Sequence, residues 1–368
     1  CKASMDELGM GGTNKNAYTG AVHNPYDLDR IPGGSSGGCA ALVAAGCVPL
    51  AIGTDTGDSV RKPAAYCGVV GVKPTYGRIS RYGIIPYASS LDHVGYFTTN
   101  VKDAALALEV LAGRDDHDMT SSYEAVKEYS KLLNGDLTNK TIGIFKTVMD
   151  EVKNEELKAQ FNTLVSKLEE KGAKIVEVVM PKEYMELIAP VYKTIANAEA
   201  TANHSNLDGI RFGMREEGQD LEEVMTNTRT KGFSSYVRAR FVIGSYSLFE
   251  ENQDRLFRKA QKIRRLIVQA YAKMFEECDA VLSVAAPTIA PLINESTNVR
   301  FGVSSFAEEH MQLQNFSGYP SITLPLGKVD SMPVAVNLTC KPFEEQKMFD
   351  VSSAIEECTG LKGQCLEG

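Results

Sequence analysis

The sequence predicts a layered α/β fold. Short apolar runs typical of buried strands alternate along the chain with longer segments of helical periodicity. The chain has 368 residues, of which 43% are hydrophobic, so it can bury a sizeable core. Its apolar runs all stay below the 18 or more residues that a membrane-spanning helix needs, so we expect no membrane segment and no signal peptide.

The predicted elements follow in order. Residues 1–30 are rich in Gly, Asn and Asp and predict a structured loop. The small apolar run after PGGSSGG predicts a buried helix that ends at Gly46. The expected strands are 48–53, with both faces covered, and then 68–72, 141–145, 174–179, 280–284, 321–324 and 334–338.

Helical periodicity predicts a covering helix at 101–112 with Gly113 as its C-cap, and an amphipathic helix at 154–171. Residues 183–276 are expected to be mainly helical with long polar faces. The sequence contains no repeat, low-complexity linker or clear boundary, so residues 1–368 are expected to form a single domain.

Composition narrows the class of protein. A net charge of -8 and a pI near 5.4 argue against a surface that coats nucleic acid, although a local basic strip or a partner could still contact RNA. The eight cysteines form no CxxC pair and have no nearby histidines, so we expect no metal site. They are typical of reduced, mostly buried thiols in a cytoplasmic protein.

The glycine-rich stretch PGGSSGG, residues 32–38, has two simple interpretations. It could be a flexible linker, or a tight turn that holds an anion at the start of a helix. Because no GK[ST] follows it, a nucleotide-binding loop is disfavoured.

The stretch DTGDSVR, residues 55–61, places Ser59 where the amides of residues 56–59 could converge on one point. Such a cluster stabilises an oxyanion by about 3 kcal/mol per donor. A serine nucleophile also needs a base, and none of the five histidines is linked to Ser59 by spacing or by a GxSxG motif. An alternative relay would pass the proton through Ser35, which lies 24 residues earlier, to a neutral lysine.

Together these stretches resemble the amidase signature family. The resemblance rests on PGGSSGG, GTDTGDSVRKPAAYCGVVGVKPTYGRIS (53–80) and YASSLDHVG (87–95), and it covers nearly the whole chain. MDELGMGG, KPTYGRISRYG, SSLD and DGIRFG are most similar to the A subunits of glutamyl-tRNA(Gln) amidotransferases within that family. The resemblance implies a central mixed β-sheet covered by helices on both faces.

The resemblance also implies roles for individual residues. Ser59 would be the acylated nucleophile, and Ser35, joined to Gly34 by a cis peptide bond, would be the bridging serine of a Ser-Ser-Lys triad. The backbone amides of Thr56, Gly57, Asp58 and Ser59 would form the oxyanion hole. Gly34, Asp55 and Arg61 would brace the two loops, the latter two as a structural ion pair.

The implied activity is hydrolysis of glutamine, with ammonia delivered to a B subunit that converts glutamyl-tRNA(Gln) to glutaminyl-tRNA(Gln). A small C subunit would strap the two together, and tRNA would be reached only through the B subunit. No cofactor is expected in this subunit, since the partner subunit uses ATP and Mg²⁺ in the family. Two alternatives stay open: a free-standing amidase of the same family, and a non-catalytic assembly subunit.

The sequence departs from the family pattern in three places. The family lysine lies several tens of residues before the GGSS turn, whereas Ser35 has only 34 residues before it and Lys2 belongs to another segment. We therefore expect that the N-terminal part is missing and that residues 1–368 alone turn over little or no amide. Asp58 replaces a glycine, which is favoured where a bend needs unusual backbone angles, and Asn252 and Gln253 replace a tyrosine-rich stretch that helps to shape the glutamine pocket.

Overall fold

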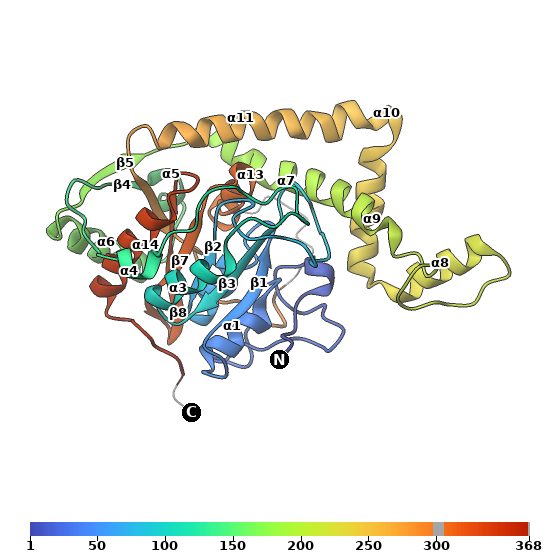
Figure 1. The fold of residues 1–368 in the computed structure, drawn as a ribbon, viewed down its shortest axis with the longest axis horizontal. Helices are drawn as coiled ribbons and strands as arrows, with labels where there is room; N and C mark the ends of the chain where they lie inside the picture. Colours follow the sequence, from blue (N-terminus) through green and yellow to red (C-terminus); the bar gives the residue numbers. More distant parts are fainter. Residues whose placement is uncertain (297–304, 367–368) are drawn as a thin grey trace.

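A computed structural model describes residues 1–296 and 305–366. Its centre is one sheet with the strand order β1-β3-β2-β7-β8-β6-β4-β5 (Figure 1). Strand β4 pairs in parallel with β5 and β6, and every other pair is antiparallel, so the predicted mixed sheet is confirmed. The strands are β1 (Ala51–Asp55), β2 (Val70–Lys73), β3 (His93–Thr98), β4 (Thr141–Phe145), β5 (Lys174–Val178), β6 (Ala280–Val284), β7 (Ser321–Val329) and β8 (Met332–Cys340).

Helices cover both faces of the sheet, as expected. On one face, Val336 and Leu338 of β8 belong to a core that includes α3 (Val101–Leu111), α6 (Glu155–Glu170) and α14 (Glu345–Thr359), with α4 (Tyr129–Leu132) beside them. On the other face, Ala335 packs with Ala65 of α2 (Arg61–Cys67), and α1 (Gly37–Ala44) lies next to α2. Successive side chains of a strand point to opposite faces, which accounts for this division.

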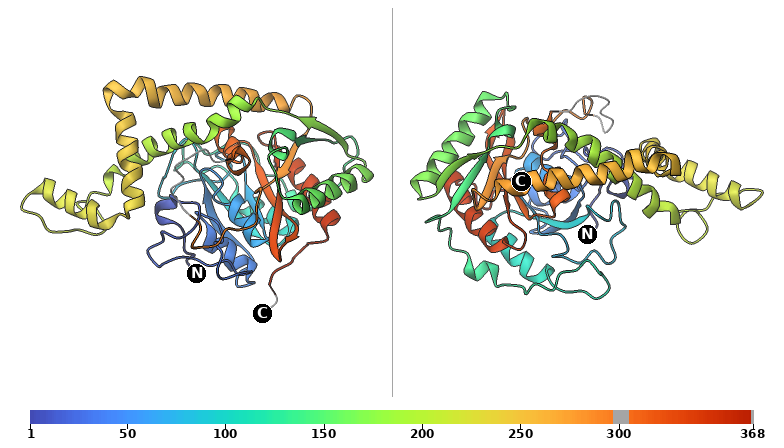
Figure 2. Two further views of the ribbon diagram at one scale, coloured as in Figure 1. Left: turned by 180° about the vertical axis from the view of Figure 1, so that it is seen from behind. Right: turned by 90° about the horizontal axis from the view of Figure 1, so that it is seen from above.

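The segment predicted to be mainly helical forms a second layer and an arm. Helix α7 (Lys182–Asn203) packs on α9 (Ser235–Leu248) and on α11 (Lys259–Met274), and α8 (Leu221–Gly232) projects away from the sheet (Figures 1 and 2). Four short helices complete this side: α5 (Lys146–Met149), α10 (Glu250–Gln253), α12 (Phe306–Glu309) and α13 (Gln312–Ser317). Short helical turns lie at Glu7–Gly9, His204–Asn206 and Asp254–Arg258.

Several predicted elements are confirmed closely, among them β4, β6 and α6. Helix α1 ends at Ala44 with Ala45 as its C-cap, and Gly46 follows with a left-handed φ of 67°, so the predicted end is correct to within two residues. The prediction that the first strand is covered on both faces is wrong: β1 is an edge strand, and Ile52 is 49% exposed. Strand β3 was not predicted. Helix α3 ends at Leu111 with Ala112 as its C-cap, so Gly113 is not the cap.

Five of the eight cysteines are buried and all eight are free, which confirms the prediction of free, mostly buried thiols. Within residues 1–296 and 305–366, no group of three or more His, Cys, Asp or Glu side chains could hold a metal ion. No helix in the same ranges is both long enough and apolar enough to cross a bilayer. The single-domain organisation stays a prediction.

Candidate active site

The two serine-bearing loops meet at the start of α1 and α2. Ser35 precedes α1 and Ser59 precedes α2, and the amide of Ser36 donates to the carbonyl of Ser59 at 3.1 Å. Both serines are buried, with 1% and 5% of their surfaces exposed. The peptide bond between Gly34 and Ser35 is cis. The Ser35 hydroxyl has no hydrogen-bond partner among the described residues.

Asp6 holds the glycine-rich turn in place. Its amide donates to the carbonyl of Ser35 at 3.0 Å, and its carboxylate accepts a hydrogen bond from the amide of Asn14 at 2.9 Å. Burial raises the pKa of Asp6 to about 6. A methyl group on Gly34 would lie 2.3 Å from the Asp6 carboxylate, so this close approach requires glycine at that position.

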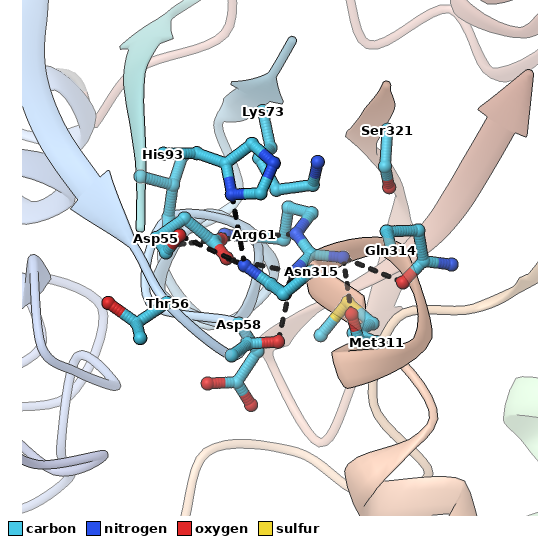
Figure 3. A network of polar contacts seen from close by, with 12 residues as sticks. Asp55, Thr56, Asp58, Arg61, Lys73, His93, Met311, Gln314, Asn315 and Ser321 are labelled. Atoms are coloured by element: carbon cyan, nitrogen blue, oxygen red, sulfur yellow. Dashed lines mark hydrogen bonds and ion pairs between the residues drawn. The ribbon is translucent and has the colours of Figure 1, made fainter. Parts of the chain in front are cut away.

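Asp55 and Arg61, at the two ends of the Ser59 loop, form an ion pair whose side chains are completely buried. Figure 3 shows the pair within a network of polar contacts. The guanidinium donates to both carboxylate oxygens of Asp55, at 2.8 and 3.1 Å, and to the carbonyl of Gly57 at 2.9 Å. Burial alone would raise the pKa of Asp55, but the adjacent Arg61 holds it well below its usual range. Asn315 of α13 contacts both members of the pair.

The backbone amides of this loop fall into two sets, according to whether they donate to the Asp55 carboxylate. Those of Val60 and Arg61 donate to the Asp55 carboxylate at 2.9 and 3.4 Å. Those of residues 56–59 donate to no other group in the described part of the chain, and Gly57, Asp58 and Ser59 line the pocket described next, whereas Thr56 does not. Asp58 does not have a positive φ, so the glycine-like backbone considered for this position is not needed.

A pocket opens above Ser59, and its walls come from distant parts of the chain. Four of its residues form an aromatic and cationic wall: Tyr87, Tyr192, Tyr236 and Arg240. The Arg240 guanidinium donates to the hydroxyls of Tyr87 and Tyr236. The other lining residues are Gly11, Gly12, Thr13, Ile31, Gly57, Asp58, Ser59, Lys62, Tyr66, Lys193, Pro291, Ser296, Glu308, Glu309 and Gln312.

The expected effect of Asn252 and Gln253 on this pocket is not seen. Neither residue lines it; Asn252 is buried in α10, where its amide donates to the carbonyl of Tyr246 at 2.9 Å. The tyrosines of the pocket wall, Tyr87, Tyr192 and Tyr236, were not identified as site residues from the sequence. Asp92 was also missed: it accepts a hydrogen bond from the Thr56 hydroxyl at 2.7 Å, and burial raises its pKa to about 6.

No histidine serves Ser59. His93 Nδ1 lies 2.7 Å from the carbonyl of Leu91, and His310 pairs with Ser283 and with the carbonyl of Ala307, while burial lowers its pKa to about 3. His23 and His117 contact Leu28 and Asp115, and His204 packs on Phe241. Burial lowers the pKa of Lys73, but its amine donates to the carbonyls of Tyr319 and Pro74 and forms no hydrogen bond with the Ser35 hydroxyl.

Comparisons with known proteins agree with this geometry. The family model described as Amidase matches residues 1–349. The chain is 42% identical to the A subunit of the glutamyl-tRNA(Gln) amidotransferase of Fusobacterium nucleatum, over 97% of this chain and 73% of that protein. It is 41% identical to the corresponding A subunit of Coxiella burnetii, over 97% of this chain and 74% of that protein.

Solved structures give the same result. The crystal structure of the A subunit of glutamyl-tRNA(Gln) amidotransferase from Thermotoga maritima matches with a TM-score of 0.78 and 33% identity, covering 97% of this chain and 72% of that one. The native peptide amidase of Stenotrophomonas maltophilia matches with a TM-score of 0.78 and 26% identity, covering 98% and 73%. The buried serine pair, the shared fold and these similarities together show that the chain belongs to the amidase signature family.

Proposed function

We propose that this chain is the glutamine-hydrolysing component of an amidotransferase, with Ser59 as the nucleophile. The observation that carries the proposal is the junction of the two serine loops: Ser59 lies on the pocket wall, beside amides that donate to no other described group. Attack by the Ser59 oxygen on the amide carbon would move negative charge onto the carbonyl oxygen. The amides of residues 56–59 would then bind that oxygen.

The pocket fits a substrate with both charges of an amino acid. Arg240 and Lys193 bring positive charge to the pocket, and Glu308 and Glu309 bring negative charge. A guanidinium is suited to bind a carboxylate, and a carboxylate is suited to bind an ammonium group. Glutamine carries both groups and a side-chain amide, so each of its charges would meet side chains of opposite charge on the pocket wall.

Ser35 would pass the proton of Ser59 onward. A serine hydroxyl can relay a proton but cannot hold it, so a base must follow Ser35. In the proposed triad this base is a neutral lysine from outside residues 1–368. The base would return that proton to the amide nitrogen as the C–N bond breaks, which leaves a glutamyl ester on Ser59 and releases ammonia. Water would then hydrolyse the ester to glutamate and free Ser59. The ammonia would pass to a partner B subunit, held with this chain by a C subunit, for the conversion of glutamyl-tRNA(Gln).

Ammonia release from glutamine tests the proposal. The assay compares residues 1–368 with the natural polypeptide that contains them, and we expect turnover only when the base is present. Ser59→Ala should then lower kcat by at least about 10³-fold, because no other group can form the ester. Ser352→Ala is the matched control, since Ser352 is equally buried in α14 and its hydroxyl has no partner among the described residues.

One observation favours a second candidate, a non-catalytic assembly protein. The Ser35 hydroxyl lacks a partner within the described residues, as it would in a protein that kept the fold but lost the relay. Under that alternative, the natural polypeptide would release no ammonia, and Ser59→Ala would leave assembly with its partners unchanged. A free-standing amidase would instead hydrolyse other small amides without preference for glutamine and without a partner.

A further inference from the structure

Asp58 and Lys62 form a charged pair beside the proposed nucleophile. The two side chains lie one helical turn apart, because the amide of Lys62 donates to the carbonyl of Asp58 at 2.8 Å. The Lys62 amine is 3.9 Å from a carboxylate oxygen of Asp58, and only 7% and 23% of the two side chains are exposed. Both residues line the same pocket as Ser59.

Lys62 is held by α12 on the opposite wall. Its amine donates to the carbonyl of Glu308 at 2.9 Å and to the Glu308 carboxylate at 3.1 Å. These bonds fix the ammonium group next to Asp58, so it does not move freely in solvent. Lys62 therefore ties the Ser59 loop to the wall that carries Glu308.

The other charged and titratable groups near Asp58 cannot replace Lys62. Asp55 and Arg61 come from the same segment, but they already neutralise each other in their buried ion pair. Glu309 of α12 adds negative charge, and Tyr192 of α7 is neutral at ordinary pH because burial raises its pKa. Among the described residues, Lys62 is thus the ion-pair partner of Asp58, and it shares its charge with the nearer carboxylate of Glu308.

This balance matters for the proposed chemistry. The oxyanion hole needs the backbone amide of Asp58, but an uncompensated carboxylate on the same residue would oppose the negative charge of the tetrahedral intermediate. We infer that Lys62 is a positioning residue, which holds the Asp58 carboxylate against the pocket wall and offsets its charge while Ser59 reacts. The inference rests on the proposed function of Ser59.

The titration of Asp58 makes the inference testable. Burial raises the pKa of Asp58 to about 7, whereas the charge of Lys62 lowers it. Below that pKa the carboxyl is neutral, and above it the charge is paired with Lys62. Without Lys62 the pKa of Asp58 moves higher still, and above the new value the carboxylate has no counter-charge.

The experiment is the pH profile of glutamine hydrolysis by the natural polypeptide that contains residues 1–368. For Lys62→Met we expect kcat and kcat/KM to fall about tenfold or more at alkaline pH relative to neutral pH, a loss comparable to or smaller than that of one oxyanion-hole donor. The wild type and Lys62→Arg should show no such fall. The double variant Asp58→Asn/Lys62→Met should also lack it, because no carboxylate then remains to ionise.

Lys347→Met is the matched control. Lys347 also bridges two acidic groups, Asp279 and Glu344, but it lies outside the pocket, so its loss should leave the pH profile unchanged. A Lys62→Met profile parallel to the wild type, or an alkaline fall that persists in the double variant, would overturn the inference. If Ser59→Ala keeps full turnover, the proposed role of Ser59 as the nucleophile is wrong. If Ser59→Ala is inactive but the Lys62 variants behave as just described, only the inference about Lys62 is wrong.

Folding gives a second readout. If Lys62→Met does not fold but the double variant does, the uncompensated carboxylate is the cause, and the inference is supported. If both fail to fold while Lys62→Arg is stable, the charge of Lys62 is needed by Glu308 or by the fold and not by Asp58, and the inference is overturned.

Discussion

Replacing Arg61 by Met should cause one of the largest losses of stability in this protein. Methionine keeps much of the side-chain length but leaves the Asp55 carboxylate buried without its partner. Removing one member of a buried ion pair costs about 3–5 kcal/mol. Arg61 also donates to the carbonyls of Gly57 and Met311 and to the side chains of Gln314 and Asn315.

These contacts do not add independently, so we expect a loss of about 4 kcal/mol in the free energy of unfolding. The entropy of unfolding is about 2.1 cal/mol/K per residue, which for a chain of 368 residues gives about 0.8 kcal/mol/K. The expected decrease in Tm is therefore about 5 °C. Thermal unfolding followed by circular dichroism or calorimetry would measure it.

Two further variants separate charge from packing. Asp55→Asn/Arg61→Met should recover part of the loss, because the buried charge is removed together with its partner. Arg258→Met should lower Tm by less than about 1 °C, since the pair of Arg258 with Asp254 is 60% and 82% exposed. A decrease of less than about 2 °C for Arg61→Met would refute the reasoning that this ion pair braces the loop.

The remaining predictions concern pH, close packing and thiol exposure. The folded-state pKa of Asp58, about 7, lies above its unfolded value, so the stabilising effect of its protonation is complete below pH 3.8 and is lost as the pH rises to 7. Urea titrations should show wild type losing about 4 kcal/mol relative to Asp58→Asn over this window, and an unchanged difference would disprove it. Gly34→Ala should lower the free energy of unfolding by at least about 2 kcal/mol because its methyl group would overlap Asp6, whereas Gly232→Ala, whose nearest atom is 4.0 Å away, should not; equal effects would contradict the close approach. In the native protein a thiol reagent should modify three cysteines rapidly and the other five only after unfolding, and rapid labelling of more than three would contradict the described burial. The three are Cys1, Cys47 and Cys365.

Much of the sheet could be predicted from local patterns. The runs at Thr141–Phe145 and Ala280–Val284 are short and rich in β-branched residues, and the observed strands have the predicted bounds. Strand β3, His93–Thr98, was missed because His93 and Gly95 break its apolar run, although the whole strand is buried. Its histidine is accommodated by the carbonyl of Leu91, a contact that the sequence pattern does not reveal.

The exposure of β1 shows the same limit. Its apolar sequence predicted burial on both faces, because such runs are typical of central strands. In the structure β1 pairs only with β3 and lies at the edge of the sheet. Strand order depends on pairings between distant segments, and hydrophobicity along one strand does not determine it.

The sequence by itself singled out the two glycine-rich loops, because such turns are set by neighbours along the chain. Ser35 and Ser59 were candidates from these loops, and the resemblance to the family added Asp55 and Arg61 as a structural pair. Only the tertiary structure decided what surrounds them. Arg240 and Glu308 are about 180 to 250 residues from Ser59 in sequence, and they reach the pocket because α9 and α12 both pack on α7. Such long-range packing depends on the whole core, so no local pattern of residues could have disclosed it.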